Sequence, residues 1–345
     1  MARVTEAPLL ETPLLETRGL TKHFPQQGGL ARRLRGQKPS TLVAVEDVSL
    51  AIRRGETLGL VGESGSGKST FGRLLLQLET PTSGDILFEG TSVLGRGERS
   101  ARELRKRIQV IFQDPYSSLN PTMTVRQMLE EVLAVHRIVP KEVRPARVAD
   151  LLERVGLAHE FAGRRPHQFS GGQRQRICIA RALAVEPDFI VADEAVSALD
   201  VSVQAQVLNL MMRLQEELGL TYLFISHNLT VMRHISEHVA VMYLGRIVEQ
   251  SPTETLFAEP LHPYTQALLK AAPKPAPRRR AITPAVSGDI PSPIDRPTGC
   301  HFHPRCKFVM DVCRTEYPAV RRVGGALVAC HLYPGDDAAP AAPGA

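Results

Sequence analysis

Tryptophan is absent from this sequence of 345 residues, and aromatic residues make up only 5% of it. A hydrophobic core must therefore be built from leucine, valine, isoleucine and alanine. Apolar residues account for 43% of the chain, which is enough for a substantial core. A chain of this length predicts one large α/β domain of roughly 250 residues and an appendage.

Long hydrophobic runs are absent as well. No apolar stretch approaches the roughly 20 residues that cross a bilayer as a helix. The first residues carry acids and prolines, whereas a secretory signal needs a continuous apolar stretch. We therefore expect the chain to lie in the cytosol, where thiols stay reduced.

Neither sign of charge dominates. Lys and Arg number 42 and Asp and Glu number 36, which gives a net charge of +6. This excess suits nucleotide phosphates or an anionic membrane surface, but a dedicated DNA-binding protein more often has a denser basic stripe. The basic clusters at 32–35 and 278–280 lie among glycines or prolines and are interpreted as solvated loops, with lipid headgroups as the alternative contact.

Cysteine is scarce, with five residues in all. Cys178 stands alone and is expected to pack in a core. The other four crowd the C-terminal end, at Cys300, Cys306, Cys313 and Cys330. In a reducing compartment such a group indicates a metal site more than disulfides. The alternative is a small fold with plain reduced cysteines.

Strand-like and helix-like segments alternate along most of the chain. This alternation predicts a mainly parallel sheet with helices on both faces. The expected strands begin near residue 14 and continue at 43–52, 57–61, 85–88, 108–112, 188–192, 221–226, 239–243 and 245–248. The expected helices cover 68–78, 124–137, 141–155, 203–218, 228–236 and 263–271. We predict disordered ends at 1–13 and 334–345, a core at 14–271, a linker at 272–281 and a Cys-bearing region at 282–333.

A glycine-rich loop lies between the apolar segment 57–61 and the helix that is expected to follow it. It fits the P-loop pattern in full and in the required context. Glycines let successive backbone N–H groups point at phosphate oxygens, and the helix adds the positive end of its dipole. The alternative is a glycine-rich turn with a chance lysine. The loop reads Gly62-Glu63-Ser64-Gly65-Ser66-Gly67-Lys68-Ser69-Thr70.

Two side chains of this loop have specific predicted roles. Lys68 supplies a mobile positive charge for the β- and γ-phosphates, and the Ser69 hydroxyl is placed to ligate Mg²⁺.

Two carboxylates end the apolar segment 188–192, at Asp193 and Glu194. Ligands bind at the carboxyl ends of parallel strands. We expect Asp193 to hold Mg²⁺ through water and Glu194 to orient and polarise the attacking water. The alternative is a strand capped by solvated acids.

A further segment distinguishes among the P-loop families. It resembles the signature sequence of ABC ATPases and reads Phe169-Ser170-Gly171-Gly172-Gln173 followed by Arg174-Gln175-Arg176. The order of the other motifs is also similar to that family over roughly residues 14–270. The resemblance implies an α/β P-loop NTPase of ABC type with ATP and Mg²⁺. It would have a mainly parallel core sheet, an antiparallel β subdomain, a helical subdomain at about 114–185 and a small Cys-containing C-terminal appendage.

The resemblance also implies how the signature works. Ser170 bonds a γ-phosphate oxygen, Gly171 and Gly172 bring backbone N–H groups close, and Gln173 belongs to the same segment. Because the P-loop already occupies one side of the phosphates, the signature acts on ATP held by the opposite subunit. ATP therefore joins two subunits head to tail.

Four more residues match positions of the family. By this resemblance, Gln113 would sense Mg²⁺ and the attacking water, His227 would hydrogen-bond the γ-phosphate and Glu194, and Asp200 would lie at the dimer interface. Adenine needs a stacking face. Phe24 is the last aromatic residue before the P-loop and matches the adenine-stacking position, with a core phenylalanine as the alternative.

Several segments look like those of the oligopeptide/dipeptide and nickel importer ATPases. They are 61–69, 112–121, 261–265, 288–293 and the trailing 299–306. The resemblance implies an ATPase that powers peptide import from the cytoplasmic face of the membrane, as a peripheral subunit. Nickel or another small solute is the alternative cargo. The implied partners are an identical or paralogous ATPase, two membrane permeases and, indirectly, a solute-binding protein.

Other classes of ABC protein fit less well. ABC ATPases that act on DNA or ribosomes usually carry two nucleotide domains or a long coiled coil in one chain. Neither is visible here, so we expect no nucleic-acid partner. A nucleotide-binding but inactive subunit is disfavoured because Glu194, Lys68, Ser170 and His227 are all present.

Some peptide-importer ATPases carry an iron–sulfur cluster in the region of the C-terminal cysteines. The resemblance thus implies a [4Fe–4S] cluster or Zn²⁺ at residues 300, 306, 313 and 330, although their spacing is not that of a zinc finger. Further candidate ligands are His301, His303 and His331.

Overall fold

The computed structural model describes residues 12–25, 41–271 and 291–333. The predictions for the linker, the C-terminal tail, the two basic clusters and almost all of the N-terminal segment lie outside these residues.

Two sheets form the body of the chain, and the smaller one is antiparallel. Its four strands are ordered β2-β1-β4-β5. Leu15, Val48 and Ile86 are buried on this sheet, so its apolar face is turned toward the core. The strands are β1 (Leu15–Pro25), β2 (Thr41–Ile52), β4 (Ser83–Phe88) and β5 (Thr91–Ser92).

The larger sheet has eight strands in the order β11-β12-β10-β9-β3-β8-β7-β6. Strands β9, β3, β8, β7 and β6 pair in parallel, and β10, β12 and β11 continue the sheet antiparallel. The central strands are continuous buried runs, as expected for strands covered on both faces. The strands are β3 (Thr57–Val61), β6 (Ile108–Ile111), β7 (Phe189–Asp193), β8 (Thr221–Ser226), β9 (His238–Tyr243), β10 (Arg246–Pro252), β11 (Val320–Val323) and β12 (Ala326–Ala329).

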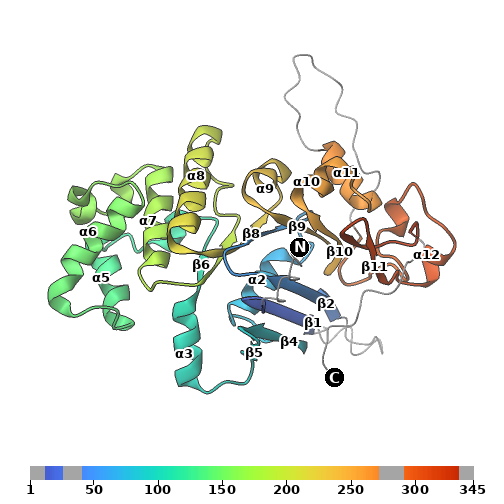
Figure 1. Cartoon of the computed structure of the whole chain (residues 1–345), viewed down its shortest axis with the longest axis horizontal. Coiled ribbons are helices and arrows are strands. Elements are labelled where there is room, and N and C mark those ends of the chain that lie inside the picture. The colour runs from blue at the N-terminus through green and yellow to red at the C-terminus, as the bar shows by residue number, and fades with distance from the viewer. Residues whose placement is uncertain (1–11, 26–40, 272–290, 334–345) are drawn as a thin grey trace, which may run out of the picture.

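Helices cover both faces of the larger sheet, and further helices lie beyond one end of it (Figure 1). There α5, α6 and α7 form a lobe, while β11 and α12 lie at the opposite end of the molecule. The helices are α2 (Lys68–Leu75), α3 (Glu98–Arg107), α4 (Pro115–Ser118), α5 (Val125–Val135), α6 (Arg144–Arg154), α7 (Gly171–Leu183), α8 (Val201–Leu218), α9 (Leu229–Ile235), α10 (Thr253–Ala258), α11 (Pro263–Ala271) and α12 (Val312–Thr315). Short 3₁₀ turns lie at Lys141–Val143, His159–Gly163, Pro166–Gln168 and His303–Arg305.

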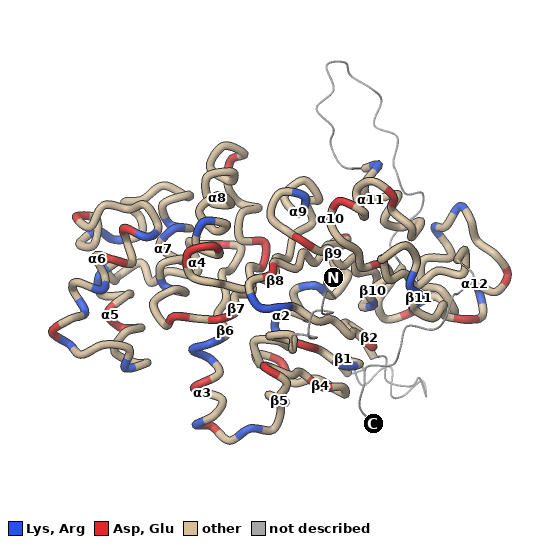
Figure 2. The backbone as a smooth tube through the Cα atoms, in the orientation of Figure 1, with Lys and Arg blue, Asp and Glu red and all other residues tan. Residues whose placement is uncertain are grey.

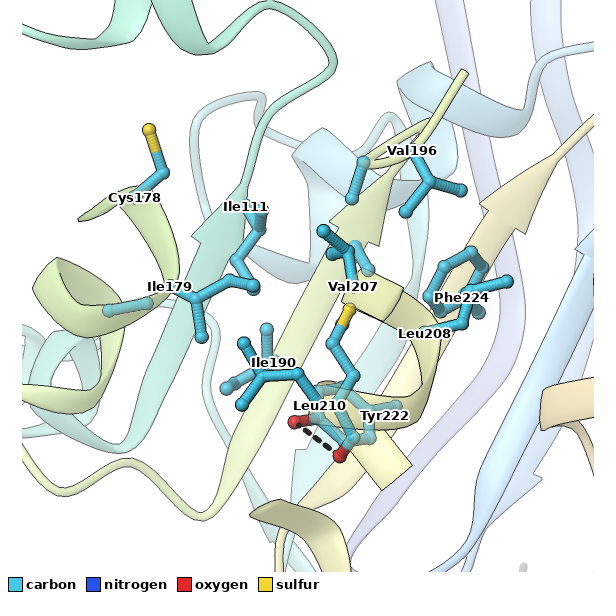
Figure 3. Packing of buried hydrophobic residues seen from close by; sticks show 14 of the residues in the cluster. Ile111, Cys178, Ile179, Ile190, Val196, Val207, Leu208, Leu210, Tyr222 and Phe224 are labelled. Carbon is cyan, nitrogen blue, oxygen red and sulfur yellow. Dashed lines mark hydrogen bonds between the residues drawn. The ribbon is translucent and has the colours of Figure 1, made fainter. Parts of the chain in front are cut away.

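The two faces of the larger sheet belong to two hydrophobic clusters. Ile190 and Tyr222 pack under α7 and α8, in the same cluster as buried Cys178 (Figure 3). Their neighbours Val191 and Leu223 point to the other face and pack with α2 and the smaller sheet. Because side chains alternate along a strand, each of these strands contributes to both clusters.

The C-terminal region joins the main sheet. Strand β12 pairs antiparallel with β10, with Glu249 opposite Val328 and Gln250 opposite Leu327. Sequence analysis predicted a small appendage, and the structure shows in addition that its strands prolong the core sheet. The hairpin expected at 245–248 is longer than predicted, because β10 pairs with β9 from Arg246 to Pro252.

Charges are distributed over the whole of the described chain. Lys and Arg are interspersed with Asp and Glu over the helical lobe, α3 and the C-terminal region (Figure 2). Over the same residues, no helix combines the length and apolar character needed to cross a bilayer.

Candidate functional site

The glycine-rich loop leaves the end of β3 and closes onto α2. Gly65 and Gly67 have φ values of 77° and 106°, in the region that favours glycine. A Cβ on Gly67 would lie 2.1 Å from the carbonyl oxygen of Ala44 in β2, and one on Gly62 would lie 2.2 Å from that of Met242 in β9. These close approaches require glycine, and they seat the loop against two strands.

The Lys68 ammonium is held across the loop by backbone oxygens. Its Nζ donates to the carbonyls of Gly62 at 2.8 Å and Glu63 at 3.0 Å. Lys68 is only 5% exposed, and burial lowers its pKa, opposed by the nearby Glu194, Asp193 and Glu63. A buried, pre-oriented cation of this kind would be stabilised by a bound anion.

Ser69 and Asp193 meet between α2 and the end of β7. The Ser69 hydroxyl donates to Asp193 Oδ1 at 3.1 Å. Burial raises the pKa of Asp193, and the hydrogen bond from Ser69 opposes this rise. A hydroxyl and a carboxylate at adjacent positions are the hard oxygen donors that Mg²⁺ prefers, so the donor set fits that ion.

A pocket of about 550 Å³ opens beside this pair. Gln113, which follows β6, lines it together with Ser69 and Asp193, so the three predicted Mg²⁺-associated residues share one pocket. Its full lining is Ser69, Arg73, Phe112, Gln113, Asp114, Ser117, Ser118, Arg181 and Asp193.

Glu194 and His227 meet just beyond two neighbouring strands. Glu194 Oε1 lies 3.1 Å from His227 Nδ1, and the Glu194 N–H donates to the Ile225 carbonyl of β8 at 2.9 Å. Glu194 has a φ of 50°, which is uncommon for a residue with a side chain. The His227 side chain is 59% exposed against 20% for Glu194, so the pair opens toward solvent.

The signature segment begins helix α7. Ser170 is the N-cap residue: its Oγ accepts from the Gln173 N–H at 3.3 Å, and the Gln173 side chain accepts from the Ser170 N–H at 3.0 Å. This capping box explains the serine and glutamine spacing. A Cβ on Gly172 would approach Val203 of α8 to 2.3 Å, so glycine allows close packing of these helices.

The structure does not bring the signature to the pocket of the same chain. Over the described residues, the lining of the pocket does not include Ser170, Gly171 or Gly172. Gly171 instead lies near Leu199, and the next residue, Asp200, is the N-cap residue of α8 but makes no capping hydrogen bond with its side chain. The two halves of the predicted ATP site are therefore built on separate parts of one chain.

Phe24 lies between the core and the surface. It lies near the end of β1, is half-buried, and belongs to neither hydrophobic cluster. The Lys22 ammonium lies 4.7 Å from its ring centroid and is paired with Glu79 at 3.0 Å.

Two contacts of the P-loop were not predicted. The Tyr264 hydroxyl accepts from the Glu63 N–H at 2.8 Å, and Arg305 pairs with the Glu63 carboxylate. Tyr264 lies in a segment singled out by resemblance alone, and nothing in the sequence around Arg305 indicates a partner so distant.

The predicted metal site at the C-terminal cysteines has no support. Among the described residues, no group of three or more His, Cys, Asp or Glu side chains is arranged to hold a metal ion. All four cysteines are free. Burial raises the pKa of the Cys300 and Cys330 thiols to about 11. The grouping of the four cysteines and the family resemblance suggested this site, and the described residues give it no support.

Comparisons with known proteins agree with this geometry. The ABC transporter family matches residues 45–197, and the family described as oligopeptide/dipeptide transporter, C-terminal region matches residues 248–313. A probable peptide ABC transporter ATP-binding protein of Sinorhizobium fredii is 52% identical over 320 residues, covering 92% of this chain and 90% of the relative. The chain belongs to the oligopeptide/dipeptide family of ABC transporter ATP-binding proteins.

Other members of the family and solved structures extend this likeness. This ABC ATPase is 49% identical to the oligopeptide transport ATP-binding protein AppF of Bacillus subtilis, over 93% of this chain and 97% of the relative. The structure of cbiO1 from Clostridium perfringens superposes with a TM-score of 0.61 at 28% identity, covering 72% of this chain and 92% of that one. The cassette MJ0796, solved as a dimer bound to ADP and Pi, has a TM-score of 0.60 at 28% identity, covering 69% and 98%.

Proposed function

We propose that this ABC ATPase hydrolyses ATP in a head-to-tail dimer and powers the import of peptides across the cytoplasmic membrane. One observation carries the catalytic part. Lys68, which lies near Asp193 and Glu194, and His227, which contacts Glu194, gather where the parallel strands β3, β7 and β8 end. Ser170 begins a helix elsewhere in the chain.

ATP binding follows from the loop. The γ-phosphate charge is met by the Lys68 ammonium and by N–H groups at the start of α2. Mg²⁺ held by Ser69, Asp193 and Gln113 would neutralise further charge on the phosphates. The pre-oriented lysine lowers the reorganisation required when the nucleotide arrives.

Hydrolysis places a water molecule between the γ-phosphate and Glu194. The water oxygen attacks phosphorus, the bond to the bridging oxygen of ADP breaks, and the water proton passes to the Glu194 carboxylate. His227 Nδ1 lies 3.1 Å from that carboxylate. In the charged form of the imidazole, in which both ring nitrogens donate, His227 would orient the carboxylate and also donate to the γ-phosphate. Positioning and electrostatics dominate phosphoryl transfer, which suits this arrangement.

The dimer completes each site. Ser170, Gly171, Gly172 and Gln173 begin α7, whose positive end suits an anion, and they act on ATP bound to the P-loop of the partner subunit. Asp200 lies beside this segment and belongs to the same interface. ATP binding closes the dimer, and hydrolysis lets it open.

The cargo assignment rests on relatives. The Sinorhizobium fredii and Bacillus subtilis proteins are named for peptide and oligopeptide transport. We place the subunit peripherally at the cytoplasmic face, with a second ATPase, two permeases and indirectly a solute-binding protein. The domain division at 14–271 and 282–333 belongs to this proposal; the iron–sulfur or zinc site does not.

Reconstitution tests the transport function. We expect the chain to co-purify with membrane permeases, and we expect the assembly in proteoliposomes to hydrolyse ATP faster when its peptide-loaded binding protein is added. Stimulation by nickel or another solute instead of di- and oligopeptides would reassign the cargo. Co-purification of nucleic acid without permeases would contradict the transport function.

Replacing Phe24 with alanine is expected to weaken ATP binding about fivefold, because an aromatic stacking partner contributes about 1 kcal/mol. Calorimetric titration with ATP measures the dissociation constant. Phe24→Tyr keeps the ring and should bind as the original chain does. Equal affinity of the alanine variant would assign Phe24 to packing alone.

A further inference from the structure

Three groups of one P-loop residue, Glu63, are each engaged by a different partner. Its N–H donates to the Tyr264 hydroxyl at 2.8 Å, its carboxylate accepts from Arg305, and its carbonyl accepts from the Lys68 ammonium at 3.0 Å. The last contact links Glu63 directly to the predicted phosphate-binding charge. The other two come from the region C-terminal to the catalytic motifs.

The contact with Arg305 is bidentate. Its two terminal nitrogens donate to the two carboxylate oxygens of Glu63 at 2.8 and 2.9 Å, across 242 positions of sequence. The Arg305 side chain is 5% exposed. Paired hydrogen bonds of this kind fix orientation as well as distance, and low exposure limits screening by water and salt.

Aromatic packing keeps Arg305 and Tyr264 in place. The Tyr243 ring lies 4.6 Å from Tyr264 and 5.3 Å from Phe302, and Tyr264 lies 5.4 Å from Phe302, between centroids. The Arg305 guanidinium also reaches the Tyr243 hydroxyl at 3.4 Å. Because Tyr264 is fully buried and Phe302 is 3% exposed, this cluster has little room to shift.

Side-chain hydrogen bonds to the backbone hold the segment just before α11, and with it Tyr264. The buried Glu249 accepts from the N–H groups of Leu261 and His262 at 2.9 Å each, just before α11. The Tyr333 hydroxyl donates to the Leu261 carbonyl at 2.7 Å. Since Glu249 also lies on β10, opposite β12, the support of Tyr264 is continuous with the main sheet.

We propose that Arg305 of the C-terminal region is a positioning residue for the ATP site, which acts through Glu63 to hold the P-loop and the Lys68 ammonium ready for phosphate. This inference rests on the proposed function of the P-loop. Arg305 touches neither nucleotide nor water in this scheme; its effect passes through the Glu63 carboxylate and carbonyl. The C-terminal region thereby sets the affinity of the chain for ATP.

Removing the guanidinium should release this loop. In Arg305→Met the Glu63 carboxylate loses both hydrogen bonds, and the carbonyl that orients Lys68 is held less firmly. We expect the dissociation constant and KM for ATP to rise about tenfold, since small displacements in a binding site have large effects. We expect kcat to stay within about threefold, because Lys68 contacts the substrate before and during reaction.

Arg314→Met is the matched control. Arg314 lies in α12 of the same region and is exposed, and its guanidinium makes no hydrogen bond or ion pair within the described part of the chain. The KM of Arg314→Met for ATP should equal that of the original chain. A purely structural role of Arg305 would lower the melting temperature and the active fraction, and so lower kcat while KM stayed constant; that result would overturn the proposal.

A double-mutant cycle tests the route through Glu63. If Arg305 acts through this carboxylate, Glu63→Gln and Arg305→Met together should raise KM no more than the larger single effect, whereas independent residues give additive effects. Additive effects would overturn the proposal. If Arg305→Met fails to fold, Arg305→Lys takes its place, because lysine keeps the charge but loses the bidentate geometry. An unchanged KM for ATP in Arg305→Lys would also overturn the proposal.

Assays of the unmodified chain distinguish a failure of the proposed ATPase function from a failure of the Arg305 proposal. If it binds no ATP, the proposed function fails. If it binds and hydrolyses ATP and Arg305→Met has an unchanged KM, only the role of Arg305 fails.

Discussion

Replacing Glu194 with glutamine is expected to slow ATP hydrolysis by about 100- to 1,000-fold while ATP binding is retained. Glutamine has nearly the same shape but cannot accept the proton of the attacking water. Its amide can still face His227, which lies 3.1 Å from the carboxylate in the present structure. The chemical step is therefore lost while the phosphate-binding groups stay, and a closed ATP-bound dimer should accumulate.

Single-turnover hydrolysis and size-exclusion chromatography with ATP and Mg²⁺ measure both effects. Glu216→Gln is the control, because Glu216 is exposed on α8 and its carboxylate makes no hydrogen bond or ion pair within the described residues. That variant should turn over normally. Normal turnover by the Glu194 variant would remove this carboxylate from the chemistry.

Removing the Lys68 ammonium is expected to weaken ATP binding by about 100-fold, or roughly 2.7 kcal/mol. Lys68→Ala removes the charge and the stem, and Lys68→Met removes the charge but keeps an apolar stem. Both variants leave the β- and γ-phosphates without the cation that the loop carbonyls now hold. Both should therefore bind ATP poorly, whatever the packing of the stem.

The nucleotide-free melting temperature separates binding from folding. Burial lowers the pKa of Lys68, so the folded chain holds this proton less tightly than the unfolded chain. Charged Lys68 thus reduces stability at neutral pH, and that penalty is lost as the pH rises from the folded-state pKa through the higher unfolded-state pKa. We expect no fall in melting temperature for Lys68→Met.

Lys106→Met, on the exposed helix α3, is the control for binding. Tight ATP binding by the Lys68 variants would contradict the phosphate role.

The elements around the P-loop could be predicted from sequence because their signals are local. The expected strand 57–61 is β3, and the helix begins at Lys68 as predicted. Gln113, Glu194 and His227 were expected after apolar strands, and β6, β7 and β8 end just before them. In a parallel sheet these ends meet at one edge, so order along the chain sufficed to predict their proximity.

Helix α3 shows where this reasoning fails. Its sequence, ERSARELRKR, buries only Leu104. A helix with a single buried side chain has no apolar periodicity to detect. The polar helix is instead supported by charge pairs along its own surface, such as Lys106 with Glu103 at 3.0 Å.

The C-terminal region was the least predictable part. Strands β11 and β12 are four residues each, too short for a clear alternating pattern, and their pairing with β10 joins distant segments. The bond between Arg305 and Glu63 is equally non-local. The metal prediction, by contrast, rested on the grouping of the cysteines and on resemblance, and neither says whether the fold arranges these side chains around a metal ion.

Pairing of β12 with β10 also determines what shortening the chain would do. A polypeptide ending before residue 291 would leave the backbone N–H and C=O groups of β10 without partners along one side. Such an open margin is a template for strands from other molecules. Strands β11 and β12 thus keep this side of β10 paired and move the open edge of the sheet to β11, a four-residue strand that carries Arg321 and Arg322. A short, charged strand is a poorer template for pairing than β10 would be.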